Sequence, residues 1–258
     1  VDAETGKNTP VVGNSITAAK RVFEANSGKE IMYGLEQEFF FYDKDTLQPL
    51  AWSQKIAPKE QGKYYCGINR CTNVERLIMD EFMEKANSVG LTLSGINQEV
   101  APSQWEYQIG PVLGIECAHQ MTIAKYMMYC LCEQHNLYPV FHPKPIQNRK
   151  WNGSGCHINI STRALRDSFG GLADILKRLG DDHVRFMEEY SGKDNSMRMS
   201  GDCETSLWNV FTYGIGDRTA SVRIPSICAK DDCGYIEDRR PASNIDYYKT
   251  TAYYANLL

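Results

Sequence analysis

The sequence of 258 residues lacks any long hydrophobic run and any strong excess of charge of one sign. No stretch approaches the roughly 20 apolar residues that span a bilayer, and the opening segment VDAETGKNTP contains no hydrophobic signal core. The net charge of −4 gives no support for nucleic-acid binding. These absences predict an intracellular, cytoplasmic protein that binds neither membrane nor nucleic acid.

The sequence also lacks the common nucleotide-binding motifs. It contains no GxGxxG, no GxxxxGK[ST], no βαβ rhythm, no internal repeat and no low-complexity stretch. The nine cysteines are odd in number and follow no disulfide or zinc spacing, which predicts reduced, buried thiols. What remains, with 42% hydrophobic and 23% charged residues, is ordinary for one sizeable globular domain.

Apolar periodicity and helix-ending residues predict several helices with strands between them. The predicted helices cover residues 15–27, 74–89, 118–133, 171–190 and 205–213. The first is expected to begin at Asn14 or Ser15 and the second at Asn73, and each ends at a glycine, Gly28 or Gly90. Helices packed against an antiparallel sheet make an α+β fold.

Two carboxylates lie two residues apart in the strand-like run YGLEQEFFF, residues 33–41. Since residues i and i+2 of a strand face the same way, Glu36 and Glu38 crowd one face. Like charges held together in a partly buried place are costly unless a cation sits beside them. An isolated Glu-x-Glu is more often a solvated strand face, so a metal site needs further ligands.

Three other extended segments supply such ligands. Glu99 and Glu106 flank a proline, and Glu106 alternates with glutamines on one predicted strand face while apolar residues take the other. His157 and Asn159 share a strand face, and Glu237 lies on the same side of its segment as an arginine. Each segment alone also fits an ordinary surface, a satisfied histidine or an ion pair.

Taken together, the candidate ligands are five glutamates and one histidine. Oxygen ligands with a single imidazole suit Mg²⁺ or Mn²⁺ better than Zn²⁺. Six ligands exceed what one ion needs beside its substrate and waters, so we expect two ions. The six residues are Glu36, Glu38, Glu99, Glu106, His157 and Glu237.

Seven sequence blocks then identify a family resemblance. In chain order they are YGLEQEF, NQEVAPSQWEYQIGP, HPKPI, WNGSGCHINIST, DNSMRMSGDCETS, DRTASVRIP and GYIEDRRPASNIDYY. Over nearly its whole length the chain resembles glutamine synthetases of the eukaryotic type. The resemblance implies a curved antiparallel sheet that carries the metal ligands and is flanked by helices. It also implies a linker and first helix in residues 1–30 and a catalytic domain in residues 31–258.

The function implied by this resemblance is ATP-dependent ligation of ammonia to the γ-carboxyl of L-glutamate, through γ-glutamyl phosphate. ATP is the co-substrate and Mg²⁺ or Mn²⁺ the cofactor, because phosphoryl transfer needs its moving charge neutralised. The resemblance assigns one ion to Glu38, Glu99 and Glu106 and the other to Glu36, His157 and Glu237.

The resemblance also assigns the other site residues. Arg218, with a catalytic role, and Arg223 match positions that contact the ATP phosphates, and a turn near Ala220 or Ser221 is needed for both to converge. Glu204 matches a flap glutamate that closes over the intermediate and helps guide ammonia. The positions that match the glutamate-binding residues, where arginine can grip a carboxylate, are Asn152, Gly153, Arg198 and Arg239.

The sequence departs from the family pattern in several places. Family members carry a β-rich domain ahead of the catalytic domain, and this chain begins near the linker that follows it. The segment WSQKIAPKEQGKYYCGI is short and lysine-rich where the family has a loop rich in glycine and proline, NRCTNVERLIMDE replaces a block with Gly-Arg-Asp, and Cys203 replaces a histidine. A catalytically silent relative, or a ligase for another amine, therefore stays open. Since family members form stacked rings, we expect a homo-oligomer, weaker or altered if this chain is the whole polypeptide.

Overall fold

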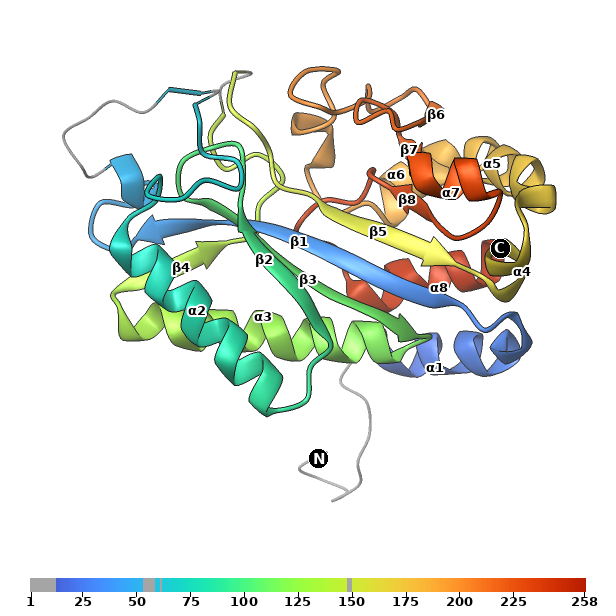
Figure 1. Ribbon diagram of the computed structural model, residues 1–258, viewed down its shortest axis with the longest axis horizontal. Coiled ribbons are helices and arrows are strands. Elements are labelled where there is room, and N and C mark those ends of the chain that lie inside the picture. Colours follow the sequence, from blue (N-terminus) through green and yellow to red (C-terminus); the bar gives the residue numbers. More distant parts are fainter. Residues whose placement is uncertain (1–12, 53–58, 61, 148–149) are drawn as a thin grey trace.

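The computed structural model describes residues 13–52, 59–60, 62–147 and 150–258. Within these ranges, eight strands form one sheet in the order β2-β3-β1-β5-β8-β7-β6, and β4 pairs with the end of β1 (Figure 1). The strands are β1 (Met32–Asp43), β2 (Leu93–Gln98), β3 (Gln104–Leu113), β4 (Leu137–Val140), β5 (Cys156–Ser161), β6 (Tyr213–Ile215), β7 (Val222–Ile224) and β8 (Ile236–Asp238). The predicted antiparallel pairing holds everywhere in this sheet except between β6 and β7, which are parallel, so the sheet is mixed.

The central strand β1 has one apolar face and one acidic face. Tyr33, Leu35, Phe39 and Phe41 are fully buried in the main hydrophobic core, and they alternate with the residues that include Glu36 and Glu38. The strands beside β1 repeat the pattern. Their core residues are Trp105, Tyr107 and Ile109 of β3 and Cys156, Ile158 and Ile160 of β5. The predicted division of faces is confirmed.

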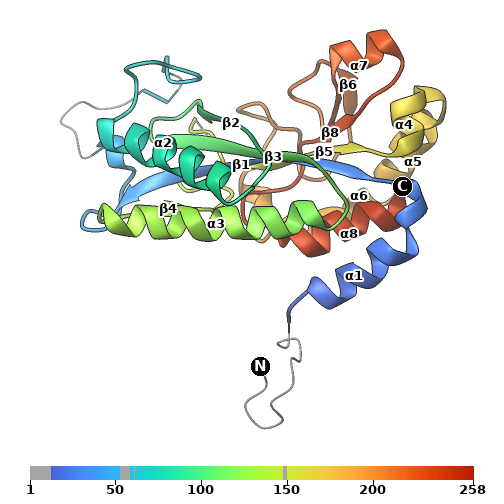
Figure 2. The same cartoon turned by 60° about the horizontal axis from the view of Figure 1, so that its bottom comes forward.

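Three helices cover the apolar face of the sheet: α2 (Asn73–Ser88), α3 (Glu116–Gln134) and α8 (Tyr247–Leu257) (Figure 2). α2 begins with a capping box, in which Thr72 Oγ1 accepts from the Glu75 N–H at 3.2 Å and the Glu75 carboxylate accepts from the Thr72 N–H at 2.9 Å. The predicted cap, Asn73, is therefore wrong by one residue. From α8, the main-chain oxygen of Thr251 accepts a hydrogen bond from Tyr33 on β1 at 2.9 Å.

The remaining helices lie toward one end of the molecule, the right-hand side of Figure 1, where α1 (Ile16–Ala25) packs against α8. The others are α4 (Arg163–Asp167), α5 (Leu172–Asp181), α6 (His183–Glu189) and α7 (Ser226–Asp231), with 3-10 turns at Ser27–Lys29, Leu50–Trp52, Phe169–Gly171 and Asn195–Met197. No helix in the described ranges is both long and apolar enough to cross a membrane.

Two helix predictions differ from the structure. The helix expected over 171–190 is divided at Asp182 into α5 and α6. The prediction of a helix over 205–213 is wrong. Leu207 pairs with Ser200 as an antiparallel bridge, and the Trp208 N–H donates to the main-chain oxygen of Met199 at 2.9 Å. Pairing with a distant segment has overridden the local periodicity there.

Candidate metal centre and active site

Strand pairing gathers most of the candidate ligands on one face of the sheet. β1 places Glu36 directly opposite His157 of β5, and it places Glu38 directly opposite Glu106 of β3. Because paired residues on neighbouring strands point to the same side, these four side chains leave the sheet together. β8 pairs with the other edge of β5 and adds Glu237 to the group.

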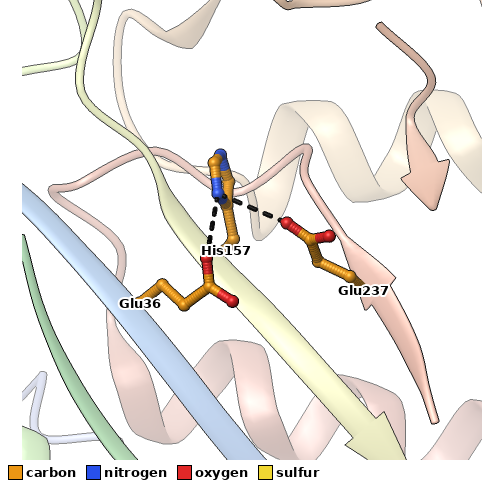
Figure 3. Close-up of side chains that lie close together, drawn as sticks. All are labelled: Glu36, His157 and Glu237. Carbon is orange, nitrogen blue, oxygen red and sulfur yellow. Dashed lines mark ion pairs between the residues drawn. The ribbon is translucent and has the colours of Figure 1, made fainter. Parts of the chain in front are cut away.

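The first group consists of Glu36, His157 and Glu237. The Nδ1 atom of His157 lies 3.6 Å from Glu36 Oε2 and 3.6 Å from Glu237 Oε1 (Figure 3). Burial, and then the positive charge of Arg239, hold the pKa of His157 well below its usual range. The imidazole is therefore neutral, which is the form that ligates a cation. The structure brings together the three residues expected to share one ion.

The second group differs from the expected one. Glu38, Glu106 and His157 each offer a ligand atom within 4.8 Å of the others. Glu99 lies just beyond the end of β2, where its carboxylate accepts hydrogen bonds from the Asn97 side chain at 3.0 Å and from the next main-chain N–H at 3.3 Å. Within the described ranges, Glu99 is not part of either close group of candidate ligands.

These carboxylates share an unfavourable environment. Burial raises the pKa of Glu38 to about 7, although the Gly155 N–H donates to this carboxylate at 2.6 Å. Burial, reinforced by the charge of Glu38, raises the pKa of Glu99, and burial with the charge of Glu99 raises that of Glu106. A divalent cation would offset this repulsion, so the donor set fits Mg²⁺ or Mn²⁺.

Arginines already neutralise Glu237. Arg239 donates to Glu237 Oε1 at 2.8 Å, as their predicted shared side requires, and the other carboxylate oxygen forms an ion pair with Arg223 of β7. Arg223 and Glu237 are paired directly across β7 and β8. The Nε atom of Arg239 is buried and has no hydrogen-bond partner among the described residues. Arg239 therefore keeps one donor that is available to a bound anion.

Arg198 and the glycines near His157 form a tightly packed cradle. Arg198 is buried, and its Nη2 donates to the main-chain oxygens of Arg239, Arg240 and Pro241 at 2.8–3.0 Å. A Cβ on Gly153 would lie 2.3 Å from a main-chain oxygen and 2.5 Å from Arg198. A Cβ on Gly155, which is absent from the predicted site, would lie 2.8 Å from His157. Only glycine allows this approach; Asn152 lies beside it and is buried.

Glu204 lies at the tip of a tight turn. Both Cys203 and Glu204 have left-handed backbone conformations, with φ of 51° and 60°, which cost non-glycine residues on the order of 1 kcal/mol each. The Glu204 carboxylate is 3.7 Å from Arg218, and the Arg218 guanidinium stacks over the Tyr65 ring at 5.6 Å. Arg218 itself lies in a turn before β7, with bends at residues 220 and 221, where the sequence predicted a turn.

A cavity of about 650 Å³ adjoins the carboxylates. It runs from Glu36 and Glu106 to Tyr235 and Arg166, with Tyr65 also on its wall. These last three residues were not among the predicted site residues, although Tyr235 lies in the family block GYIEDRRPASNIDYY and Tyr65 in the segment WSQKIAPKEQGKYYCGI. The polar face of β3 was the available signal, since Gln108 also lines the cavity. The segment at residues 53–58 and 61, part of the lysine-rich loop noted in the sequence, lies outside the described residues.

The chain is similar to known proteins along nearly all of its length. The family model described as glutamine synthetase, catalytic domain, matches residues 16–168. A glutamine synthetase-like protein of Acanthamoeba polyphaga mimivirus is 45% identical over 94% of this chain and 68% of its own length. The glutamine synthetase of Agaricus bisporus is 40% identical over 97% of this chain and 71% of its own length, and that of Saccharomyces cerevisiae is 40% identical over 94% and 65%. The chain thus spans about two thirds of the length of these relatives.

The fold also matches a solved structure. GmaS without ligand superposes with a TM-score of 0.75 over 96% of this chain and 58% of that chain, at 22% sequence identity. At this identity the likeness shows the fold alone.

Proposed function

This chain belongs to the glutamine synthetase family, and from that premise we propose that it ligates ammonia to the γ-carboxyl of L-glutamate with ATP. In the proposed reaction the γ-carboxylate takes the terminal phosphoryl group of ATP, releasing ADP, and ammonia then displaces phosphate to leave L-glutamine. The observation that carries the proposal is the convergence of four glutamates and a neutral histidine on one sheet face.

Divalent cations are part of this proposal. Glu36, His157 and Glu237 would hold one ion, and Glu38 and Glu106 would hold the other, with Glu99 as the further ligand that the family resemblance predicts. Bound cations supply positive charge to the phosphoryl group as it is transferred. The raised pKa values of the buried glutamates support this assignment, since such a cluster favours a proton or a cation over a vacant, fully ionised state.

The arginines have complementary roles in the proposed site. Arg239, with its unpartnered Nε, and Arg198 would bind glutamate beside Asn152 and Gly153. Arg218 and Arg223 would contact the ATP phosphates, and Arg223 would then exchange its pairing with Glu237 for a phosphate oxygen. The cavity beside Glu36 has a volume typical of small-ligand sites, which supports it as the nucleotide site. Glu204, near Arg218, would close over the acyl phosphate.

The division into residues 1–30 and 31–258, the cytoplasmic location, the stacked homo-oligomer and the choice between Mg²⁺ and Mn²⁺ stay predictions. The identity of the amine is the finest part of the proposal. Ligation of another amine to glutamate would use the same metal and phosphate chemistry, so only the acceptor distinguishes the two reactions.

The proposal is tested by glutamate-dependent ADP formation from ATP with Mg²⁺ or Mn²⁺. The reaction is run without acceptor and with ammonia, hydroxylamine or a larger amine. Stimulation by ammonia with formation of glutamine supports the proposal. Stimulation by the larger amine alone would show that the larger amine, and not ammonia, is the substrate. Glu38→Gln should abolish turnover, while Glu84→Gln, an exposed carboxylate on α2, should leave it unchanged. Metal binding without any turnover would favour the catalytically silent relative.

A further inference from the structure

We infer that His183, Asp238 and Arg240 position the hairpin that carries Glu204. The hairpin comprises residues 199–208, closed by the hydrogen bond from Trp208 N–H to Met199 O at 2.9 Å and by the bridge between Ser200 and Leu207. The structural part of this inference is independent of the reaction. Its kinetic consequence rests on the proposed function, in which Glu204 closes over the intermediate.

The first leg of the hairpin is anchored by Arg198. The Nη2 atom of this residue donates to three successive main-chain oxygens, those of residues 239–241 that follow β8. Near the tip of the hairpin, Thr205 Oγ1 lies 2.8 Å from the main-chain oxygen of Asp202 and 3.2 Å from that of Arg198, so its single proton bonds to the main chain of this leg. This leg is thereby held against the same segment that carries Arg239.

The second leg is anchored through a buried chain of side chains. Asp238 and Arg240 are both fully buried, and their carboxylate and guanidinium are joined by three hydrogen bonds of 2.5–3.1 Å. The Arg240 Nη1 atom lies 3.2 Å from His183 Nδ1, and His183 Nε2 lies 3.0 Å from the main-chain oxygen of Trp208. The chain runs from β8, through α6, to the end of the hairpin.

The chemical groups determine which atom donates and which accepts in the hydrogen bonds from Arg240 through His183 to Trp208. Guanidinium can only donate, so His183 Nδ1 must accept from Arg240, and a main-chain oxygen can only accept, so Nε2 must carry the proton. His183 is therefore a neutral imidazole with one defined tautomer. The Arg240 guanidinium also stacks on Phe186 at 4.1 Å and Phe211 at 5.2 Å, which fixes its plane.

The place of these hydrogen-bonded side chains in the fold indicates that they position residues of the candidate site. Asp238, the last residue of β8, lies between Glu237 and Arg239 and points to the side of the strand opposite Glu237. The buried network of side chains therefore holds the segment that presents a candidate metal ligand, Glu237, and a candidate glutamate-binding residue, Arg239. Both legs of the Glu204 hairpin are thus tied to one four-residue segment, residues 238–241. The distance between Glu204 and the site depends on these ties, and Arg239 Nη2 contacts the Glu204 main-chain oxygen at 3.4 Å.

A pair of polar variants at His183 tests the inference. In His183→Gln the side-chain amide can still donate to Trp208 O, whereas in His183→Asn the shorter amide can still accept from Arg240 but does not reach Trp208. The matched control is His119→Asn on α3. The His119 Nδ1 atom lies 2.8 Å from the Tyr248 hydroxyl, and neither residue belongs to the hairpin. The readouts are hydrogen exchange at the Trp208 amide and the separate values of kcat and KM for ATP and glutamate.

We expect His183→Asn to speed exchange at Trp208 and to lower kcat on the order of 10- to 100-fold with little change in KM for ATP, because misplacement of a closing group affects the committed step. His183→Gln should retain both values within about threefold, as expected when the bond to Trp208 is retained. The control should change neither. Equal effects of the two variants on exchange would overturn the inference. If the unchanged protein shows no glutamate-dependent turnover, the proposed function fails, and the exchange comparison alone decides the structural part.

Discussion

At the residue scale, the site is defined by carboxylates that the protein itself buries, without a contribution from a bound cation. Glu38 and Glu106 face each other across β1 and β3, and both are less than a tenth exposed. A protein retains such groups at a cost, because like charges in a poorly solvated place repel. The folded protein therefore binds protons or cations more tightly than the unfolded chain does.

This difference predicts how stability depends on pH. The pKa of Glu38 is raised by burial from 4.5 to about 7, so between these values the folded state holds a proton that the unfolded state releases. Without metal, the free energy of unfolding should fall as pH rises from 4.5 to about 7, with Glu38 contributing on the order of 1–3 kcal/mol. Urea unfolding across this range measures it.

Glu38→Gln provides the comparison for that series. Glutamine does not ionise, so this variant should lose part of the fall while Glu99 and Glu106, whose pKa values are also raised, retain the rest. Glu84→Gln should follow the unchanged protein. A Glu38→Gln profile parallel to that of the unchanged protein would contradict the raised pKa.

At the element scale, α2 shows how a local motif stabilises the layer beneath the site. Its capping box joins Thr72 and Glu75, and the following turns bury Ile78, Met79 and Phe82 against β3 and α3. The Phe82 ring lies 5.0 Å from that of Tyr107, the residue that follows Glu106. α2 therefore packs against the strand that carries a candidate ligand.

Removing this cap should have a measurable cost. Thr72→Ala removes the side-chain oxygen that accepts from the Glu75 N–H, and we expect about 1 kcal/mol lower free energy of unfolding. Thr72→Ser keeps the oxygen and should differ from the unchanged protein by only a few tenths of a kcal/mol, as expected for an equivalent cap. Urea midpoints at constant m-value test this. Equal losses in both variants would show that the methyl packing of Thr72, and not the hydrogen bond, stabilises the helix start.

At the scale of the whole molecule, bound metal would connect distant parts of the chain. The ligands in the two close groups come from β1, β3, β5 and β8, and they lie between residues 36 and 237 of the sequence. No unfolded chain holds these groups together, so a cation should bind the folded state selectively. Ligand binding of this kind raises the melting temperature in proportion to the logarithm of the ligand concentration.

Mn²⁺ or Mg²⁺ should therefore stabilise the protein against heat. At about 100 times the dissociation constant the gain is about 2.7 kcal/mol, which corresponds to roughly 5–10 °C in Tm for a chain of this size. Differential scanning fluorimetry with increasing Mn²⁺ measures the shift, and chelation with EDTA should reverse it. Glu38→Gln should reduce the response. A Tm indifferent to millimolar Mn²⁺ and Mg²⁺ would refute the metal assignment.

Local pattern alone determined which residues share a face. The alternation of Glu36 and Glu38 with buried residues, and of Glu106 with Trp105 and Tyr107, follows from the two-residue period of a strand and is confirmed by burial. The family blocks likewise lie in the linear sequence, and the comparisons confirm the family that they indicate. Periodicity is a short-range property, so it can be predicted without knowing what packs beside the strand.

Only the tertiary structure decided which faces meet. Strand register placed Glu36 opposite His157 and left Glu99 outside the close groups of ligand atoms found in the described ranges. It also turned residues 205–208, expected to be helical, into the second leg of a hairpin tied to His183. These outcomes depend on hydrogen bonds between residues far apart in the chain, whose energies exceed helix propensities of a few tenths of a kcal/mol per residue and leave no local signal.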